Sequence, residues 1–378
     1  MDFSSKSWQI HVKHPNKILT LPKVTRNDRI MHVEEKFMAR CLELARHGAG
    51  HTAPNPMVGA VVVHNGVIVG EGYHRRCGEA HAEVNAIASV RDEAILRDST
   101  IYVSLEPCSH YGKTPPCAEL IIRKGIPRVV VGCMDPFPEV SGRGVRMLRD
   151  AGVEVVTGVL EEECRALNEA FMTFQSEKRP FVTLKWAESA DGFLDVARTS
   201  PDISPVVFSN AVTAARVHKL RAESAAILVG TNTALLDNPS LTVRRWSGKS
   251  PVRLVIDRER KIPASYHLLD DTIPTIVFTT GEKKKIGQTE YIPLDFRISI
   301  VHQILQCLFE RQLNSLMVEG GSIMLQQFLD SGYWDRAIVE ESPLALGAGV
   351  KAPVFTFGQQ SFDSFGGHIF RIYTHHRK

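Results

Sequence analysis

Short apolar runs alternate with amphipathic segments along most of the chain, and this pattern predicts an α/β protein. Apolar residues recur at helical spacing over residues 33–48. Apolar runs at 58–63 and 67–70 flank Asn65-Gly66, a dipeptide that strongly favours a β-hairpin. Beyond the hairpin we expect strands at 101–104, 129–131 and 153–156, and helices near 81, near 117, at 145–150 and at 161–176.

A second series of strands and helices follows residues 177–180, which read Glu-Lys-Arg-Pro. A charged stretch that ends in proline is typical of a linker. After it we expect strands at 181–186, 226–229, 253–256, 275–278 and 315–318, and helices at 211–221, 301–311 and 322–329. Such alternation predicts α/β sandwiches in both halves of the chain.

The pattern therefore divides the chain into three parts. Residues 1–30 should form an N-terminal extension, because they are polar and show no sustained period. This stretch is either a genuine tail or the product of an upstream start codon that is not used. The first domain should cover residues 31–176 and the second residues 180–378.

Composition narrows the class of protein. The 378 residues are 43% hydrophobic and 23% charged, which suits a soluble protein of two domains. A net charge of +3 gives no sign of a nucleic-acid surface, and no apolar run approaches the roughly 20 residues of a membrane span. No signal peptide is evident at the N-terminus, so we expect a cytoplasmic protein. Seven scattered cysteines suggest metal binding or reduced thiols rather than a disulfide scaffold.

His81, Cys108 and Cys117 have the residue types and the order of a catalytic zinc site. His81 lies at a predicted helix start, Cys108 follows a predicted strand, and Cys117 opens the next helix. One imidazole and two thiolates would leave a fourth zinc position open for water. Glu83 is then a spare carboxylate that could move a proton from that water to a departing amine. Zinc nucleobase deaminases have this arrangement.

Other interpretations of these residues stay open at the level of the sequence. The histidine and the two cysteines could be core residues, or they could hold a purely structural zinc. A structural site usually has a fourth ligand, for which Cys77 is the nearest candidate. Asn55, between Pro54 and Pro56, could present an acceptor and a donor to a ring edge, or it could belong to a plain turn.

Longer motifs around these residues resemble a known family. PNPMVGAVVV, GEAHAEVNAI and LEPCSHYGKTPPC are similar to the deaminase domain of bifunctional riboflavin-biosynthesis proteins. The eight residues between the cysteines are the distinguishing feature, because nucleoside, tRNA and cytidine deaminases usually have these cysteines closer together. Beyond the linker, KWAESADG, ILVGTNTALLDNPSLTVR, LVIDR and VEGGS resemble the matching reductase domain, so the resemblance covers residues 32–345.

The resemblance implies a cytidine-deaminase-like α/β/α domain followed by a dihydrofolate-reductase-like α/β domain. It also implies two consecutive reactions on one phosphorylated pyrimidine. The first is hydrolytic deamination of a diaminopyrimidinone with Zn2+, and the second is reduction of its ribosyl group to ribityl with NADPH. By motif, Glu83 would be the proton shuttle beside the zinc ligands, and the substrate would contact Asn55, His110 and Lys113. Lys113 could equally be a solvated loop lysine.

In the second domain the resemblance assigns two groups of site residues. Substrate contacts fall on Arg221, Leu241, Arg244 and Glu319, and two arginines suit a phosphate ester. Cofactor contacts fall on Ala187, Val207, Thr233, Asp237, Gly321 and Ser322. The Gly-Gly pair after a predicted strand could bring backbone amides to a phosphate, or could be a simple turn. No Gly-x-Gly-x-x-Gly motif is present, so a Rossmann site is not indicated.

The chain departs from the family pattern at a few positions. Pro205 and Val207 stand where a serine and a tryptophan are frequent, and Phe137 stands where an asparagine is common. These departures leave the local cofactor and substrate contacts open, including the role of Ser141, without changing the identity of the domains.

Two other classes of function compete with this interpretation. A nucleic-acid or nucleoside deaminase with an unrelated partner domain is disfavoured by the long insert and the near-neutral charge. A zinc-stabilised scaffold without catalysis is disfavoured by Glu83, for which a structural site has no use. We expect a small-molecule substrate and neither nucleic acid nor membrane as a partner. A homodimer would agree with the frequency of that state among soluble proteins.

Overall fold

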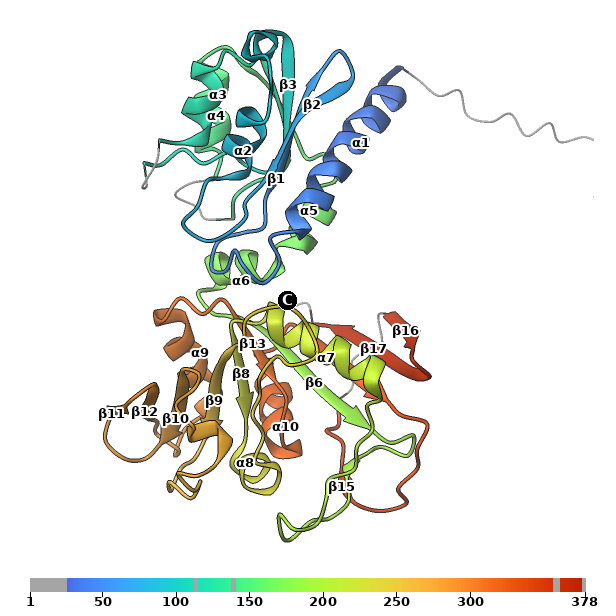
Figure 1. Cartoon of the computed structure of the whole chain (residues 1–378), viewed down its shortest axis with the longest axis vertical. Coiled ribbons are helices and arrows are strands. Elements are labelled where there is room, and N and C mark those ends of the chain that lie inside the picture. The colour runs from blue at the N-terminus through green and yellow to red at the C-terminus, as the bar shows by residue number, and fades with distance from the viewer. Residues whose placement is uncertain (1–25, 112–114, 137–140, 356–360, 376–378) are drawn as a thin grey trace, which may run out of the picture.

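The computed structural model describes residues 26–111, 115–136, 141–355 and 361–375. These residues form two α/β domains, one above the other in Figure 1, with the N-terminal domain in blue to green. Each domain has its own sheet and its own buried cores. In the described part of the chain, no helix is both long and apolar enough to cross a membrane.

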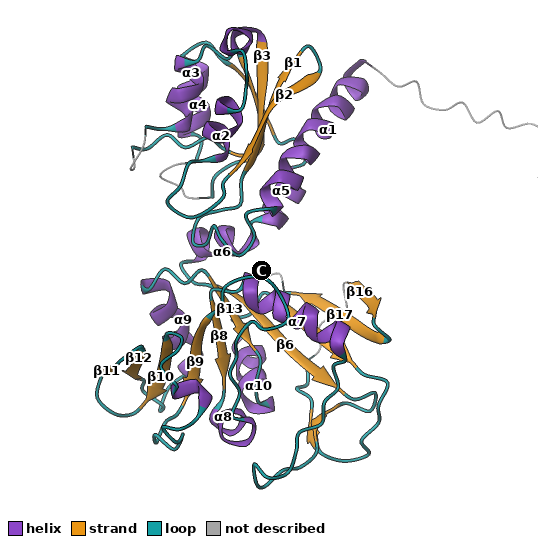
Figure 2. Ribbon diagram, in the orientation of Figure 1, coloured by secondary structure: helices purple, strands orange, loops and turns teal. Residues whose placement is uncertain are grey.

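The N-terminal domain has three layers, with helices on both faces of one sheet (Figure 2). The strand order is β2-β1-β3-β4-β5. The strands are β1 (Gly59–His64), β2 (Val67–Tyr73), β3 (Ser99–Leu105), β4 (Arg128–Cys133) and β5 (Glu154–Thr157). Helices α1 (Arg26–Arg46) and α5 (Glu161–Leu167) cover one face, and α2 (Ala82–Ala88), α3 (Cys117–Arg123) and α4 (Arg143–Asp150) cover the other.

This double cover explains why β1 is an unbroken apolar run. Ala60 and Val62 belong to the cluster under α2, α3 and α4, whereas Val61 and Val63 belong to the cluster under α1. Successive side chains of a strand point to opposite faces, so a strand covered on both faces is apolar at every position. The predicted hairpin is confirmed, because Asn65 and Gly66 join antiparallel β1 and β2 with positive φ angles of 50° and 76°.

The C-terminal domain contains a long mixed sheet in the order β11-β12-β10-β9-β8-β13-β6-β14-β17-β16. Its central strands from β12 to β14 pair in parallel, and antiparallel strands close both edges. The strands are β6 (Phe181–Glu188), β8 (Ala226–Val229), β9 (Val252–Ile256), β10 (Thr275–Thr279), β11 (Lys284–Ile286), β12 (Thr289–Pro293), β13 (Ser315–Val318), β14 (Arg336–Glu341), β16 (Ser361–Phe365) and β17 (His368–Thr374). A separate small sheet pairs β7 (Phe193–Asp195) with β15 (Val350–Lys351).

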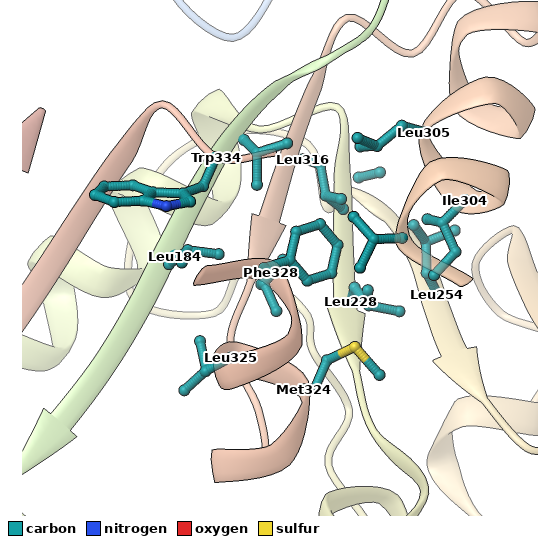
Figure 3. Packing of buried hydrophobic residues seen from close by; sticks show 14 of the residues in the cluster. Leu184, Leu228, Leu254, Ile304, Leu305, Leu316, Met324, Leu325, Phe328 and Trp334 are labelled. Atoms are coloured by element: carbon teal, nitrogen blue, oxygen red, sulfur yellow. The ribbon is translucent and has the colours of Figure 1, made fainter. Parts of the chain in front are cut away.

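Helices again cover both faces of this sheet. On one face, α9 (Ile300–Glu310) and α10 (Ser322–Ser331) enclose the larger core, where Phe328 packs among Leu228, Leu316 and Met324 (Figure 3). On the other face, α7 (Ala211–Glu223) and α8 (Thr231–Asp237) cover a second cluster that includes Val217, Ala234 and Met317. The sheet is therefore packed between two layers of helices, and the loops that follow its strands extend from this buried sheet.

The structure contains elements in both domains that were not predicted, and two departures in the first domain concern helices. Helix α1 begins at Arg26, inside the stretch that was expected to be an extension. The expected helix over 161–176 is two helices, α5 and α6 (Glu169–Glu177), with a break at Asn168. The Asn168 side chain bonds to both the N–H and the C=O of Met57, at 2.8 and 2.9 Å. An asparagine that satisfies a distant backbone in this way competes with helical geometry at its own position.

Helix α6 lies between the two domains (Figure 1) and takes part in their contacts. The ring centroids of Phe174 on α6 and Phe309 on α9 are 4.9 Å apart. Glu169 forms an ion pair with Arg336 of β14. The Asn314 side chain donates to the Pro54 carbonyl at 3.4 Å. The domains thus meet beside the segment that carries Asn55.

The predicted linker is only partly a solvated connection. Arg179 is 4% exposed, and its guanidinium makes two bonds of 2.6 Å to the Asp335 carboxylate at the start of β14. Asp335 also accepts the Val182 N–H at 2.7 Å. Arg179 is therefore part of the second domain's structure, although its sequence context is charged and next to a proline.

We expect a fragment of residues 178–378 to be more stable than one of residues 180–378. The shorter fragment lacks Arg179 and leaves the buried Asp335 carboxylate with fewer donors. Charge-assisted bonds of this kind contribute about 1.5–3 kcal/mol, so the free energy of unfolding should differ by about 2 kcal/mol. Chemical denaturation of both fragments measures this difference. Equal midpoints and slopes would show that the Arg179 contact adds nothing to the fold.

Candidate active sites

Three side chains that can bind a metal ion lie close together at one end of the N-terminal sheet. His81 precedes α2, Cys108 lies after β3, and Cys117 is the first residue of α3. The Nδ1 atom of His81 lies 3.5 Å from the Cys108 sulfur and 3.4 Å from the Cys117 sulfur. All three potential ligand atoms lie within 4.8 Å of one another. The structure thus brings together the three residues that were predicted as zinc ligands.

The local backbone fixes this cluster. The Cys117 N–H donates to the Cys108 sulfur at 3.3 Å, and the next N–H, of Ala118, donates to the Cys108 carbonyl at 3.2 Å. A hydrogen bond with the Cys117 thiol, helped by His81, lowers the pKa of Cys108 to about 4. Cys108 is therefore the more acidic of the two thiols. Two sulfurs and one imidazole nitrogen are the ligands that zinc prefers, and they leave a fourth position for solvent.

Glu83 lies on the first turn of α2, two residues from His81, and is only 3% exposed. Burial, with the nearby Cys108 adding to the effect, raises the pKa of its carboxyl to about 7. The Cys117 thiol opposes this rise in the pKa of Glu83. A carboxyl with a pKa near neutrality can both accept and return a proton.

Sequence reasoning missed His74, which connects Asn55 to this cluster. The Asn55 amide nitrogen lies 3.2 Å from Nε2 of His74, and Nδ1 of His74 lies 3.1 Å from the Ala80 carbonyl. The carbonyl needs a donor, so Nδ1 carries the proton and Nε2 accepts from Asn55. The His74 ring packs edge-on against His81, with 5.5 Å between ring centroids. The Asn55 side chain therefore has a fixed orientation, although its N–H also closes a turn by donating to the Thr52 carbonyl at 2.8 Å.

Glu106 lies within the LEPCSHYGKTPPC motif, but the sequence analysis assigned it no role. Its carboxylate is 5% exposed and accepts four backbone N–H bonds, from Asp135, Gly142, Gly144 and Val145, at 3.0–3.3 Å. A side chain at Gly144 would place its Cβ 2.0 Å from the Pro107 carbonyl. Glu106 thus ties the start of α4 against the segment that leads into Cys108. Only long-range folding creates these contacts, so no local pattern could have revealed them.

The remaining residues predicted for the deaminase site are less informative. His110 is described and lies exposed at the start of the insert between the cysteines. Lys113 and Phe137 lie outside the described residues. The exposed Cys77, which was considered as a fourth ligand, is not part of the three-residue cluster that the described residues form.

In the C-terminal domain the predicted substrate residues meet near the end of β13. The Arg221 guanidinium makes two bonds to the Glu319 carboxylate, at 2.9 and 2.6 Å, and one to the Thr242 carbonyl at 3.3 Å. Leu241 is buried with a positive φ of 53°, an uncommon backbone conformation for leucine. Arg244 is exposed, and its guanidinium donates to the Thr242 hydroxyl at 2.7 Å.

Several of the predicted cofactor residues also come together. A Cβ on Gly320 would meet the Thr233 side chain at 3.0 Å, and Gly321 has a positive φ of 78°. Both glycines are therefore required here for close approach and backbone shape. Ser322 opens α10 and donates to the Lys351 carbonyl at 2.9 Å, and Asp237 at the end of α8 forms an ion pair with Arg198.

Ala187 and Val207 are the two predicted cofactor residues for which the structure gives only a position and an exposure. Ala187 lies on β6 opposite Glu340 of β14 and is partly buried. Val207 is 74% exposed.

Comparison with known proteins defines the class of both domains. Residues 31–133 match the family model of the cytidine and deoxycytidylate deaminase zinc-binding region, which covers the whole His-Cys-Cys cluster. Residues 180–367 match the model of the RibD C-terminal domain. The chain is thus a bifunctional enzyme with a zinc-binding deaminase domain and a reductase domain.

The full-length relatives define the family. The chain is 44% identical over 329 residues to the riboflavin biosynthesis protein RibD of Aquifex aeolicus, which covers 85% of this chain and 90% of that protein. It is 37% identical over 335 residues to Escherichia coli RibD, and this alignment covers 83% of the chain and 89% of the E. coli protein. The chain belongs to the RibD family of riboflavin biosynthesis proteins, whose reductase domain depends on NADPH.

Solved structures agree with this assignment over both domains. A deaminase/reductase of this family from Thermotoga maritima superimposes with a TM-score of 0.82 at 38% identity, covering 91% of this chain and 99% of that chain. Acinetobacter baumannii RibD superimposes with the same TM-score at 29% identity. This superposition covers 92% of the present chain and 100% of the A. baumannii chain. The predicted cytidine-deaminase-like domain and reductase domain are thereby confirmed.

Proposed function

We propose that this enzyme converts 2,5-diamino-6-(5-phosphoribosylamino)pyrimidin-4-one into 5-amino-6-(5-phosphoribitylamino)uracil in two steps. The T. maritima relative carries the name of a diaminohydroxyphosphoribosylaminopyrimidine deaminase and 5-amino-6-(5-phosphoribosylamino)uracil reductase. The observation that carries the proposal is the buried Glu83 carboxyl beside the His81, Cys108 and Cys117 cluster, in the same chain as the Arg221–Glu319 site.

In the first step, Glu83 handles the protons of the hydrolysis. Zinc held by His81, Cys108 and Cys117 would supply Lewis-acid activation of water. Glu83 accepts a proton as water adds to the ring carbon that bears the amine, and returns it to the amine nitrogen as the C–N bond breaks. Burial suits this task, because it raises the pKa of the carboxyl to about 7.

The substrate ring is held by groups around this cluster. Asn55, oriented by His74, offers its amide to the edge of the pyrimidine. We propose that His110 and Lys113, in the insert that begins directly after Cys108, help to recognise the substrate. The expected domains, 31–176 and 180–378, follow the same division of labour, except that Arg179 packs in the second domain, which therefore begins at residue 179.

In the second step, the ribosyl group is reduced, and bound NADPH would supply the hydride. Thr233 of α8 lies against Gly321, which precedes Ser322 at the start of α10, and these three residues would hold the cofactor. By the resemblance, Ala187, Val207 and Asp237 would also contact it. Leu241, Arg244 and Glu319 would contact the substrate. Because Arg221 is engaged by Glu319, its main effect is to orient that carboxylate, and Arg244 supplies the exposed positive charge for the phosphate.

We expect Arg244→Ala to raise the KM for the deaminated substrate by roughly 10- to 100-fold, because a charge-assisted contact contributes about 1.5–3 kcal/mol. The KM for NADPH should stay at the wild-type value. Arg297→Ala is the control, since Arg297 is an exposed arginine whose side chain is 88% accessible and pairs with Asp295. Steady-state kinetics of reduction measures both constants. A wild-type substrate KM in Arg244→Ala would identify Arg244 as an ordinary surface residue.

Zinc content measured together with deaminase turnover tests the proposal as a whole. A catalytic site predicts about one zinc per chain and release of ammonia from the diaminopyrimidinone. Zinc without turnover would indicate a structural site, and turnover of nucleosides in place of the diaminopyrimidinone would indicate a different deaminase. We further propose that the enzyme acts in the cytoplasm and as a homodimer, in keeping with its small phosphorylated substrate and with the frequency of dimers.

A further inference from the structure

Helix α7 holds the segment that carries Leu241 and Arg244 at three successive points. The Arg244 N–H donates to Nδ1 of His218 at 3.0 Å. One turn further along α7, the Arg221 guanidinium donates to the Thr242 carbonyl at 3.3 Å. Ala222 then packs beneath Gly248, where an added Cβ would come within 2.7 Å of the Ala222 Cβ.

The segment itself is bent into a shape that needs such support. Leu241 has a φ of 53°, which costs a non-glycine residue conformational energy, and its side chain is 3% exposed. The Val243 N–H is bound by the Ser250 hydroxyl at 3.0 Å. Only after these backbone contacts does the chain turn outward, so that Arg244 and the residues after it are exposed.

His218 is suited to act as a fixed acceptor in this arrangement. It is 7% exposed, and its Nδ1 must be unprotonated to accept the Arg244 N–H. Burial, followed by the positive charges of Arg221 and Arg244, lowers the pKa of His218, and Arg245 acts in the same direction. Glu319 opposes this effect but is paired with Arg221. The neutral imidazole is thus the favoured form.

We propose that His218 is a positioning residue of the reductase site, which sets the place where the Arg244 guanidinium meets the substrate phosphate. It accepts the Arg244 N–H and so fixes the backbone from which that side chain extends. His218 does not contact the substrate itself. This inference rests on the proposed reduction of a phosphorylated substrate, and it adds a residue to which no role in that reaction has been assigned.

The test compares substitutions that remove or keep an acceptor at the position of Nδ1. His218→Leu removes the acceptor, and its KM for the deaminated phosphorylated substrate should rise by about 5-fold, in keeping with the loss of one neutral hydrogen bond. His218→Asn places an amide oxygen near the position of Nδ1 and should restore the KM to within about 2-fold of wild type. The KM for NADPH should be the same in all variants.

A double-mutant cycle shows whether His218 acts through Arg244. In an Arg244→Ala background, His218→Leu should cause no further increase in the substrate KM, because the side chain that it positions is absent. An equal increase in both backgrounds, or an unchanged KM in His218→Leu, would overturn the proposal. So would an Asn variant as impaired as the Leu variant.

Folding defects can be separated from positioning. If thermal denaturation shows that His218→Leu is not folded at the assay temperature, His218→Gln replaces it in the test. The glutamine amide lies one bond further from the backbone than that of asparagine and does not reach the position of Nδ1. A Gln variant with a wild-type KM would then refute the inference. Absence of any reduction by the wild-type enzyme would instead refute the proposed function, so the two failures are distinguishable.

Discussion

Glu83→Gln should lower deamination by about 100-fold or more while leaving zinc content and folding unchanged. The amide keeps the size of the side chain but cannot accept the proton that the carboxylate takes from water. Glu83 is buried beside the cluster without being one of its three ligands, so metal binding should survive. Ammonia release measures the first activity, and NADPH oxidation with deaminated substrate measures the second.

The reductase activity of this variant is the internal control. Its site draws on residues of the other domain, so reduction of deaminated substrate should proceed at the wild-type rate. Glu79→Gln is the matched variant, because Glu79 is an exposed glutamate of the preceding loop and should have no effect on either activity. Near-normal deamination in Glu83→Gln would remove this carboxylate from the mechanism. Equal loss of both activities in a folded variant would indicate one shared site.

Cys117→Ser should abolish stable zinc binding and destabilise the deaminase domain. Binding energy for zinc is also folding energy, and losing one of three protein ligands should cost on the order of 3 kcal/mol or more. Cys117 is 1% exposed at the start of α3, so the loss falls inside the domain. We expect little bound zinc by elemental analysis and a lower thermal midpoint for this domain that no longer rises when zinc is added.

Cys77→Ser provides the comparison for this experiment. Cys77 is exposed and does not belong to the ligand cluster, so its substitution should leave zinc content and stability at wild-type levels. Full zinc occupancy in Cys117→Ser would contradict the ligand assignment. Loss of zinc in Cys77→Ser would mean that the metal has a fourth protein ligand and that the site is structural.

Most of the regular elements followed from local patterns, and the exceptions have physical causes. The hairpin at Asn65-Gly66 was predictable because only two neighbouring residues determine it. The break at Asn168 was not, because it depends on contacts with Met57, far away in sequence. The prediction likewise missed the edge strand β16, which is exposed along its length and lacks an apolar run. It also missed β17 and the buried strand β14 beside it.

The sites show the same division between local and long-range information. His81, Glu83, Cys108 and Cys117 could be identified because metal chemistry restricts the residue types and their order. Glu106 and His218 act through backbone groups that are remote in sequence, so their contacts exist only in the folded chain. The same holds for the pairing of Arg221 with Glu319, which the sequence did not predict.

The central claim is that one chain carries out deamination and reduction in succession at two sites. The most direct measurement is to incubate the purified protein with the diaminopyrimidinone substrate, with and without NADPH, and to identify the products by mass spectrometry. Without NADPH, we expect the deaminated ribosylamino compound to accumulate. With NADPH, it should be replaced by the ribitylamino product. Recovery of unchanged substrate in both reactions, or of a reduced product that still carries the amino group, would contradict the account.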